Sequence, residues 1–374
     1  MKCILLGTAY PYRGGLAAFN ERLVREFIAA GHDASIITFT LQYPNFLFPG
    51  KTQFSDSTPP ENISIQRKVN AINPFNWWSV GKYIQQQKPD VLIIKYWLPF
   101  MAPCFATIAR IAKKNGITKV ICIADNIIPH EPKFYDNYVT KYFIKQMDGF
   151  VVMSKQVLKD LAKFNRNKLR ATTPHPLFDN FGTQISKQEA CKYLQLNADK
   201  KVYPVFGFIR DYKGLDILLN AFCNTALSDE IELIIAGEFY TDKEQYLKII
   251  PETAKHKIHL FEKFISDEEV KYYFCAADLV VQPYKHATQS GVTQIAYHFE
   301  VPMIVTDVGG LAEMVPDNEV GYVVKPNATE VENAIQKYFS ENKKAFFIAN
   351  MKEEKKRFGW DRMVEVIMGV FGKL

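Results

Sequence analysis

Arg210 and Lys213 lie three residues apart, where an apolar run passes into a helix-compatible run. The segment reads Phe206-Gly-Phe-Ile-Arg-Asp-Tyr-Lys-Gly214. Arginine supplies a planar fork of N–H donors and lysine a mobile point charge, a combination that suits a diphosphate. Taken alone, the same residues also fit a solvated basic loop. The pair therefore makes anion binding the first chemical hypothesis.

A second segment favours the same ligand. An apolar run that begins at Asp278 leads into a polar stretch with the pair Ser290-Gly291, and a helix-compatible run follows. The first N–H groups of a helix have no intrahelical partner, and the helix dipole is positive at that end. Strand, small-residue turn and helix start therefore predict an anion site formed by Ser290, Gly291, Val292 and Thr293, with phosphate as the usual occupant.

Two further segments follow apolar runs in the first half of the chain. Gly14-Gly15 makes a turn between a strand and a helix, where glycine lets a substrate approach the backbone closely. The turn lacks the G-x-G-x-x-G spacing, so we do not expect a nicotinamide dinucleotide there. The other segment, Asp125-Asn-Ile-Ile-Pro-His-Glu131, gathers polar side chains that include His130. A glycine pair or a lone histidine is by itself more often an ordinary loop feature.

The elements that must position these residues alternate between strand and helix. Period-two and buried apolar runs predict strands at 2–7, 34–39, 63–69, 91–96, 119–124, 149–154, 202–207, 231–237, 258–261, 279–282, 303–306 and 321–324. Period-3.6 patterns predict helices at 16–30, 78–87, 102–114, 138–147, 154–164, 214–223, 242–250, 267–276, 293–299 and 328–339.

Repeated strand–helix units in two similar halves predict an α/β fold with two doubly wound, Rossmann-like parallel sheets. A polar segment with proline and glycine, 174–184, is the expected hinge. Ligands of such sheets bind beyond the carboxyl ends of the strands, and two facing sheets leave a cleft between them. All four polar segments follow predicted strands, so we expect them to meet the ligands.

Composition limits the class of protein. The chain has 374 residues, more than one core usually organises, and 48% are hydrophobic. Six scattered cysteines without C-x-x-C spacing argue against a zinc site or a disulfide framework and fit a reducing cytosol. No apolar run approaches the roughly 18 residues that span a bilayer. We therefore expect a cytoplasmic enzyme, soluble or peripheral on the inner face of the cell membrane.

The charge is uneven along the chain. Residues 1–180 hold 23 Lys/Arg against 12 Asp/Glu, whereas residues 181–374 hold 23 against 28. The densest basic stretch, 141–170, contains the amphipathic segment 154–164, which could lie on an anionic membrane. The competing interpretation is a helix docked on the core with solvated lysines. Nucleic acid is the weakest alternative, since no binding motif accompanies the charge.

Together these segments resemble the GT-B glycosyltransferases of the retaining family 4 type, over nearly the whole chain. The strongest parts are the Gly207–Gly214 segment with its helix, and the block from Ala276-Ala-Asp-Leu-Val-Val-Gln-Pro283 to Gly309-Gly-Leu-Ala-Glu313. The ending Phe358-Gly-Trp-Asp-Arg362 is also similar to the family's closing segment. The resemblance implies an acceptor-binding domain at 1–178, a nucleotide-sugar domain at 179–356, and a C-terminal helix at 357–374 that packs back on the first domain.

The resemblance also implies the reaction. A sugar passes from a nucleotide-diphosphate donor to a glycan or lipid-linked acceptor with retained configuration, and no metal or other cofactor is expected. Arg210, Lys213 and the Ser290 turn would stabilise the leaving diphosphate, with Gly207 beside them. Asp125, His130, Gly14 and Gly15 would orient the donor sugar and acceptor.

The sequence departs from the family pattern at three positions. Ala287 and Ile295 stand where family members usually carry two glutamates, one of which grips the nucleotide ribose. Thr293 or Gln294 is the expected replacement for ribose recognition. Asp125 stands where the family often has a histidine. Two other functions stay open: a non-catalytic scaffold that binds nucleotide or glycan, and a sugar-nucleotide epimerase or a phosphorylase.

Overall fold

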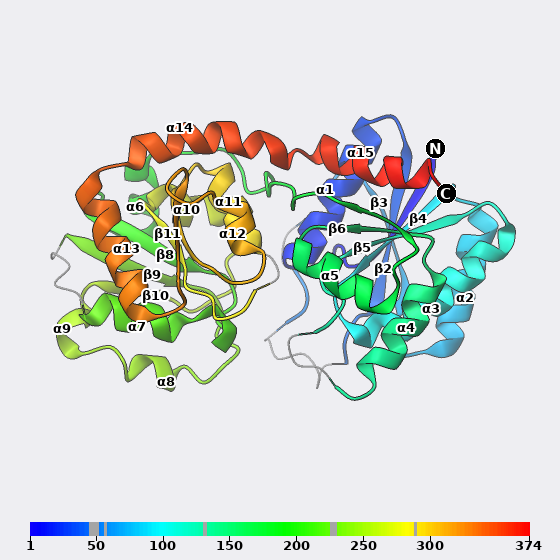
Figure 1. Cartoon of the computed structure of the whole chain (residues 1–374), viewed down its shortest axis with the longest axis horizontal. Coiled ribbons are helices and arrows are strands. Elements are labelled where there is room, and N and C mark those ends of the chain that lie inside the picture. Colours follow the sequence, from blue (N-terminus) through cyan, green and yellow to red (C-terminus); the bar gives the residue numbers. More distant parts are fainter. Residues whose placement is uncertain (45–51, 56–57, 130–132, 225–229, 288–289) are drawn as a thin grey trace. The chain divides into compact units, whose positions relative to one another are not determined.

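The computed structural model describes the chain except at 45–51, 56–57, 130–132, 225–229 and 288–289. The chain divides into two compact units (Figure 1). Unit 1 is Met1–Pro176 with Gly359–Leu374, and unit 2 is Leu177–Phe358. These divisions lie two residues from the sequence-based boundaries at 178/179 and 356/357.

Unit 1 is built on one parallel sheet of seven strands in the order β3-β2-β1-β4-β5-β6-β7. The chain moves outward in one direction from β1 and then in the other from β4, so the strand order reverses between these two central strands. The strands are β1 (Lys2–Leu6), β2 (Asp33–Leu41), β3 (Ser64–Asn70), β4 (Val91–Tyr96), β5 (Lys119–Ala124), β6 (Gly149–Val152) and β7 (Leu169–Thr172).

Helices connect these strands and cover the sheet. They are α1 (Gly15–Ala29), α2 (Pro74–Gln87), α3 (Ala102–Ala112), α4 (Asp136–Gln146), α5 (Lys155–Phe164) and α15 (Trp360–Phe371), with the 3-10 turns η2 (Pro99–Met101) and η3 (Lys113–Asn115). Local sequence sets their ends. Asn73 caps α2 by accepting from the N–H groups of Phe75 and Asn76, and Ser154 caps α5 through Val157 N–H.

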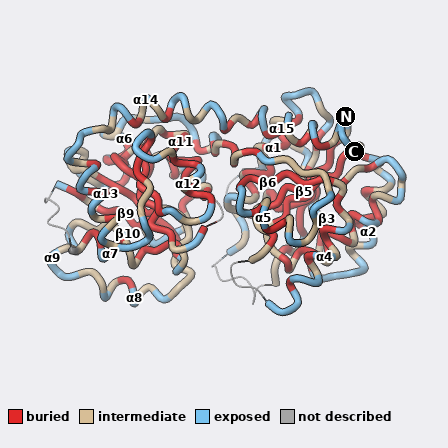
Figure 2. Tube along the Cα trace, viewed as in Figure 1, coloured by how far each residue is buried: buried red, intermediate tan, exposed pale blue. Residues whose placement is uncertain are grey.

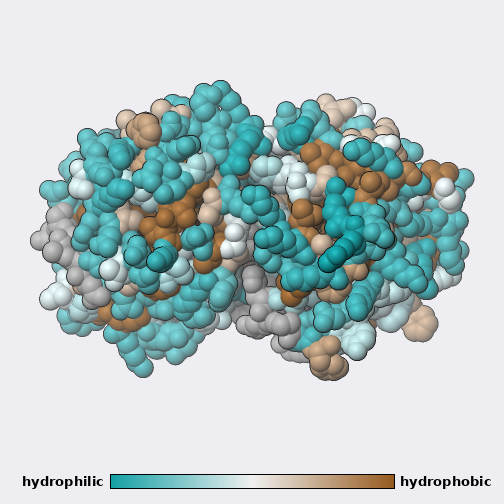
Figure 3. All heavy atoms as spheres, viewed as in Figure 1, coloured by the Kyte–Doolittle hydropathy of each residue, from teal (hydrophilic) through white to brown (hydrophobic). Residues whose placement is uncertain are grey.

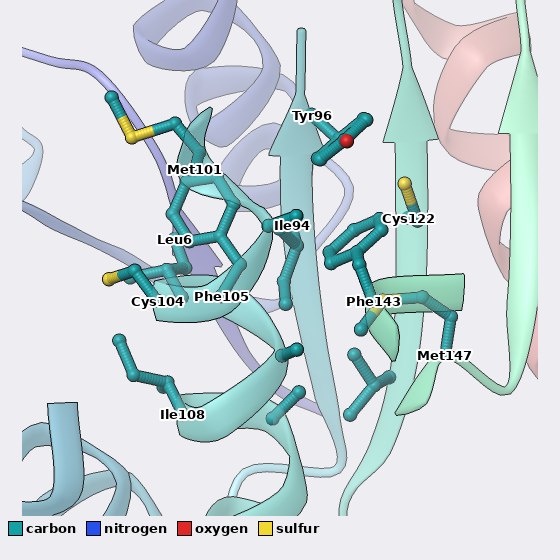
Figure 4. Packing of buried hydrophobic residues seen from close by; sticks show 14 of the residues in the cluster. Leu6, Ile94, Tyr96, Met101, Cys104, Phe105, Ile108, Cys122, Phe143 and Met147 are labelled. Carbon is teal, nitrogen blue, oxygen red and sulfur yellow. The ribbon is translucent and has the colours of Figure 1, made fainter. Parts of the chain in front are cut away.

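One hydrophobic core of unit 1 lies between the sheet and helices α2 to α5. Figure 4 shows Phe105 of α3 against Ile94 of β4, and Phe143 of α4 stacked on Tyr96, with ring centroids 4.2 Å apart. The tube view shows the central strands buried and the outer helix surfaces exposed (Figure 2). Helix α15, from the end of the chain, contacts α1, β6 and β7. A Cβ on Gly149 would lie 2.5 Å from Val370, so a glycine is required beneath this helix.

Unit 2 contains two three-stranded parallel sheets, β10-β9-β8 and β11-β12-β13. Their strands are β8 (Lys201–Phe206), β9 (Ile231–Ala236), β10 (Ile258–Phe261), β11 (Val280–Gln282), β12 (Met303–Thr306) and β13 (Gly321–Val324). The helices are α6 (Lys187–Leu194), α7 (Leu215–Asn224), α8 (Glu244–Leu247), α9 (Glu252–Lys255), α10 (Val270–Ala276), α11 (Gly291–His298), α12 (Leu311–Met314), α13 (Ala328–Glu341) and α14 (Lys344–Glu354), with η4 (Asp211–Lys213) and η5 (Lys355–Phe358).

Asp278 joins the two sheets of unit 2. Its backbone N–H donates to Val202 O at 2.7 Å, and its carboxylate accepts from Val202 N–H at 2.9 Å, so the approach to β11 is fastened to β8. Lys187 and Lys344 donate to the same carboxylate at 2.7 and 2.6 Å. Burial alone would raise the pKa of Asp278, but Lys344, Lys187 and the Val202 N–H outweigh it and hold the pKa below the usual range.

Each strand predicted from the sequence is present, with ends that differ by at most two residues. The α/β architecture with two parallel-sheet, Rossmann-like units is therefore confirmed. The sequence missed the edge strand β7, whose residues Leu-Arg-Ala-Thr carry little apolar signal, and helices α6, α9, α12 and α14. The helix predicted at 242–250 was wrong in length, since only Glu244–Leu247 is helical there.

We predict that Asp278→Asn lowers the free energy of unfolding by about 2 kcal/mol at neutral pH, because it removes two charge-assisted hydrogen bonds at a buried junction. The pKa of Asp278 is depressed by folding, so its stabilisation is complete above about pH 4 and is lost as the pH falls further. Urea unfolding at neutral and acidic pH measures both effects. Glu353→Gln, at an exposed pair with Lys356, is the matched control and should change stability little.

Candidate functional site

The two segments predicted to bind an anion lie side by side in unit 2. A Cβ on Gly214 would lie 2.0 Å from Pro283 O, so the loop after β8 packs against the residue after β11. Lys285 N–H donates to Tyr212 O at 2.7 Å, and the Lys285 ammonium lies 2.8 Å from Asp211 and 3.1 Å from Asp216. The two loops therefore form one surface at the carboxyl ends of β8 and β11.

Lys213 lies inside this surface. Its Nζ donates to Phe206 O at 3.4 Å, and a Cβ on Gly207 would lie 3.0 Å from it. Gly207 has φ +91°, so both its backbone conformation and the lysine beside it require glycine. Burial and, to a smaller extent, the positive charge of Arg210 together lower the pKa of Lys213 to about 8. A bound anion would stabilise the protonated form of this lysine.

Arg210 and Tyr284 flank this lysine. The Arg210 guanidinium is exposed and lies 4.9 Å from the centroid of the Tyr240 ring, which holds it at the surface. The ring of Tyr284 lies 5.8 Å from Lys213 Nζ, and its hydroxyl is 3.4 Å from Ser290 Oγ. Tyr284 thus connects the lysine to the start of α11.

The N-terminus of α11 begins at Gly291 with Ser290 as the N-cap residue. Ser290 makes no side-chain hydrogen bond to the helix start, since its Oγ donates to Gln282 Oε1 at 2.6 Å instead. The first backbone N–H groups of the helix are therefore not capped by this side chain. A Cβ on Gly291 would lie 2.7 Å from the ring of Phe178, so the glycine makes room for packing.

The two candidates for ribose recognition differ in their surroundings. Thr293 is fully buried, and its hydroxyl bonds to Gln282 at 3.1 Å. Gln294 is also fully buried, but neither of its side-chain amide atoms has a hydrogen-bond partner in the described structure. It lies one helical turn after Ser290 and therefore on the same face of α11. Ala287 and Ile295, where the family resemblance leads us to expect glutamates, are both buried.

The predicted polar site of unit 1 contains an unexpected lysine. Asp125, directly after β5, accepts from Lys95 Nζ at 2.7 Å. Lys95 is 1% exposed and lies 3.5 Å from the centroid of the Phe19 ring. Burial lowers the pKa of Lys95, and the Asp125 carboxylate opposes that shift. His130 and Glu131 lie outside the described residues.

The Gly14-Gly15 turn forms the start of α1. Gly14 is the N-cap residue, with φ +99°, and a glycine has no side chain that could cap the helix. A Cβ built on it would meet no atom within 4 Å, so the positive φ and not crowding requires a glycine here. Asn20, further along α1, donates to Thr8 O at 2.8 Å and ties the helix to the loop that precedes the turn.

The predicted amphipathic helix at 154–164 is α5, and its apolar face packs on unit 1. Val157 and Leu161 belong to the core, and Leu158 and Phe164 pack against it. The docked helix with solvated lysines is therefore the interpretation that the structure favours. This helix can offer a membrane charge but not an apolar face.

Sequence reasoning missed Lys95 and Asp278. Lys95 is the one charge in the apolar strand Val-Leu-Ile-Ile-Lys-Tyr, and Asp278 is the one charge in Ala-Ala-Asp-Leu-Val-Val. A single charge inside a buried strand needs a partner, and this was the available signal. Among the described residues there is no group of three or more His, Cys, Asp or Glu that could hold a metal. No helix in that part of the chain is long and apolar enough to cross a membrane.

Two family models match most of the chain. "Glycosyltransferase Family 4" matches residues 13–173, and "Glycosyl transferases group 1" matches residues 186–357. Among curated proteins, an uncharacterized glycosyltransferase of Methanocaldococcus jannaschii, MJ1178, is 22% identical over 100% of this chain and 99% of its own length. The N-acetyl-alpha-D-glucosaminyl L-malate synthase of Bacillus anthracis is 20% identical over 88% of this chain and 86% of its own.

The fold also matches solved structures along its full length. Anabaena Alr3699/HepE, in complex with UDP-glucose, superposes with a TM-score of 0.74 at 16% identity and covers 100% of both chains. At that identity the likeness concerns the fold alone.

We predict that anion binding in unit 2 weakens as the pH rises above about 8, because Lys213 then loses the proton that makes it attractive to an anion. The dissociation constant of inorganic pyrophosphate should rise by up to about tenfold per pH unit above that point. Calorimetric titration between pH 7 and pH 9.5 measures it.

Pyrophosphate itself titrates in the same way with every variant. A comparison between variants therefore isolates the effect that deprotonation of Lys213 has on the affinity. Lys213→Arg stays charged at these pH values and should not show the extra loss. Lys213→Met should bind weakly at every pH. A wild-type protein whose affinity changes in parallel with that of Lys213→Arg would contradict the assignment.

Proposed function

This chain is a GT-B glycosyltransferase of family 4, the group 1 type, and uses nucleotide-sugar donors. From that premise we propose which substrate each unit binds. Unit 2 holds the donor diphosphate between the Gly207–Gly214 loop and the start of α11. Unit 1 presents a glycan or lipid-linked acceptor near Gly14, Gly15 and Asp125. The sugar is transferred with retention of configuration, in polysaccharide or glycolipid synthesis.

The observation that carries this proposal is the buried Lys213 in a loop that packs against the segment leading to α11, whose first N–H groups are not capped by the side chain of Ser290. Breaking the bond between sugar and diphosphate places negative charge on the departing phosphate. Lys213, Arg210 and the first N–H groups of α11 lie at the carboxyl ends of β8 and β11, where the two loops meet. Donors fixed in this way stabilise charge that develops in the transition state, and need no reorganisation to do so.

Lys213 and Arg210 supply positive charge without a metal. Lys213 is desolvated, so its attraction to a phosphate is stronger than that of an exposed lysine. Arg210 is exposed and its planar fork suits bidentate contact with phosphate oxygens. Lys213 therefore supplies a buried positive charge, and Arg210 supplies an exposed one.

We assign ribose recognition to Gln294. A buried amide without partners is costly, and a ribose hydroxyl pair would supply both a donor and an acceptor. Thr293 is already bonded to Gln282. UDP is the nucleotide to test first, because the Anabaena neighbour was solved with UDP-glucose.

Asp125 is assigned to the acceptor or the transferred sugar. Its carboxylate is 21% exposed, and one oxygen is held by the buried Lys95. A carboxylate accepts hydrogen bonds only, so the other oxygen suits a sugar hydroxyl. A peripheral location on the inner face of the cell membrane, with the basic stretch 141–170 contributing charge, fits a lipid-linked acceptor.

We predict that Arg210→Ala combined with Lys213→Ala lowers turnover of the nucleotide sugar by at least about a thousandfold, because two transition-state donors are lost together. Release of nucleoside diphosphate from a panel of UDP-, GDP- and ADP-sugars measures turnover. Lys192→Ala with Lys248→Ala removes the same charge from exposed sites of unit 2 and should leave turnover unchanged. Unchanged turnover in the first variant, with the fold intact, would refute the site.

We predict that Gln294→Leu weakens UDP binding by about tenfold and leaves pyrophosphate binding unchanged, because the amide contacts the ribose and not the phosphates. Thermal shift with UDP and with pyrophosphate separates the two, since a ligand of the folded state raises the melting temperature. The ligand-free variant should also melt higher, because an unpaired buried amide is removed. Equal loss of both ligands, or of neither, would show that Gln294 does not read the ribose.

A further inference from the structure

The most exposed aromatic side chains of unit 1 gather at the starts of two helices. Phe75 and Trp78, in the first turns of α2, are 87% and 58% exposed. Phe134 and Tyr138, just before and within the start of α4, are 90% and 75% exposed. Phe134, Phe75 and Tyr138 are the most exposed large hydrophobic residues in the described parts of the chain. None of these four side chains belongs to the hydrophobic core described above, so packing in that core does not account for their aromatic character.

Both helix starts lie at the carboxyl edge of the unit 1 sheet. Helix α2 follows β3 and α4 follows β5, and all strands of this sheet are parallel. Helix α3 contacts both α2 and α4, so the two aromatic pairs flank its N-terminal end (Figure 1). Neighbouring helix axes are about 8–10 Å apart, so the pairs are separated by roughly 20 Å. Figure 3 shows a largely hydrophilic surface on which hydrophobic side chains are exposed at separate places. We call these four residues the aromatic rim.

The surroundings of the aromatic rim are basic. Among the nine Lys/Arg of residues 62–124, Arg67, Lys68 and Lys82 lie on β3 and in the middle of α2, toward this edge. Lys88, Lys113, Lys114 and Lys119 lie at the amino ends of the strands, as does the single acid of this range, Asp90. Asp90 accepts from Lys2 N–H, at the amino ends of the strands and therefore at the opposite edge. In α4 the one acid, Asp136, is buried, whereas Lys141 and Lys145 are exposed.

Lysines also accompany the aromatic side chains directly. Lys82 Nζ lies 5.9 Å from the centroid of the Trp78 ring, and Lys133 Nζ lies 6.0 Å from that of Tyr135, next to Phe134. Such pairs place an apolar ring and a cation at the same level of the surface. In a bilayer the ring enters the headgroup boundary while the lysine reaches the phosphates.

We propose that the aromatic rim docks unit 1 on an anionic lipid bilayer. Rings that are more than half exposed at the starts of two helices can each insert between lipid headgroups. Lys82, Lys133 and Lys141, on the same segments as the rings, complement anionic headgroups. Helix α5 cannot replace the rim, because its apolar face lies in the core. Docking here brings the carboxyl edge with Gly14 and Asp125 to the membrane surface.

This inference deepens the proposed function, and rests on it only in favouring a lipid-linked acceptor over a free glycan. The membrane contact itself does not depend on donor binding by unit 2. Pyrophosphate binding is therefore measured on every variant, so that loss of the donor site and loss of the membrane contact can be distinguished.

The test is co-sedimentation of the full chain with vesicles of phosphatidylcholine and phosphatidylglycerol, compared with phosphatidylcholine alone. The wild-type protein should bind the anionic vesicles, and raising the salt concentration should weaken the binding. Phe75→Ser with Trp78→Ser, and Phe134→Ser with Tyr138→Ser, should each reduce the partition by at least about tenfold, because buried aromatic area is lost.

Two single variants of hydrophobic residues that are about half exposed elsewhere serve as controls. Ile117→Ser lies just before β5, at the opposite edge of the same sheet, and Phe346→Ser lies on α14 of unit 2. Both should bind vesicles as the wild type does. The proposal is overturned if the wild type ignores anionic vesicles, if the rim variants bind equally well, or if the controls lose as much. Unchanged melting temperatures and pyrophosphate affinities show that the rim variants are folded.

Discussion

Asp278 is the contact on which the arrangement of unit 2 depends. The strands of this unit form two separate three-stranded sheets, and the carboxylate of Asp278 bonds to Val202 at the edge of one from the approach to the other. Lys187 and Lys344 hold the same carboxylate, so the N-terminal ends of α6 and α14 meet at this junction as well. The position of β11 relative to β8 is set here.

This junction lies at one end of the strands, and the anion site lies at the other. The loop with Lys213 leaves the carboxyl end of β8, and the loop that leads to Ser290 leaves the carboxyl end of β11. The two loops touch through Gly214 and Pro283 and through Lys285 and Tyr212. A shift of one sheet against the other would therefore separate Lys213 from the start of α11. A charge at one end of the sheets thus determines the geometry at the other.

Much of this fold could be predicted because its strands are short, apolar and regularly spaced. Buried parallel strands such as Val91–Tyr96 leave a continuous apolar run, and the chain repeats that run before each helix. The elements that were missed carry weak local patterns. Helix α14 buries only Phe347 and Met351, four residues apart, so its apolar stripe is a single pair. The position of the helix follows from packing that the local sequence does not encode.

The candidate site was predictable in type but not in its partners. Glycines and basic residues after a strand indicated anion binding, and the two loops do meet. The sequence could not show that the ring of Phe178 packs against Gly291, since those residues are 113 positions apart. Nor could it show that Lys95 pairs with Asp125, because the partner of a buried charge is chosen by the sheet order. Long-range neighbours of this kind are what the structure adds.

Two apolar residues of unit 2 bear on the expected nucleoside contacts. The family resemblance leads us to expect carboxylates at the positions of Ala287 and Ile295, and both side chains are neutral and buried. Burial and the neighbouring cation of Arg210 lower the pKa of Lys213. We propose that a site of this kind attracts a diphosphate and recognises the nucleoside through a neutral group. The group that we propose is the buried amide of Gln294 on α11, which lacks hydrogen-bond partners in the described structure.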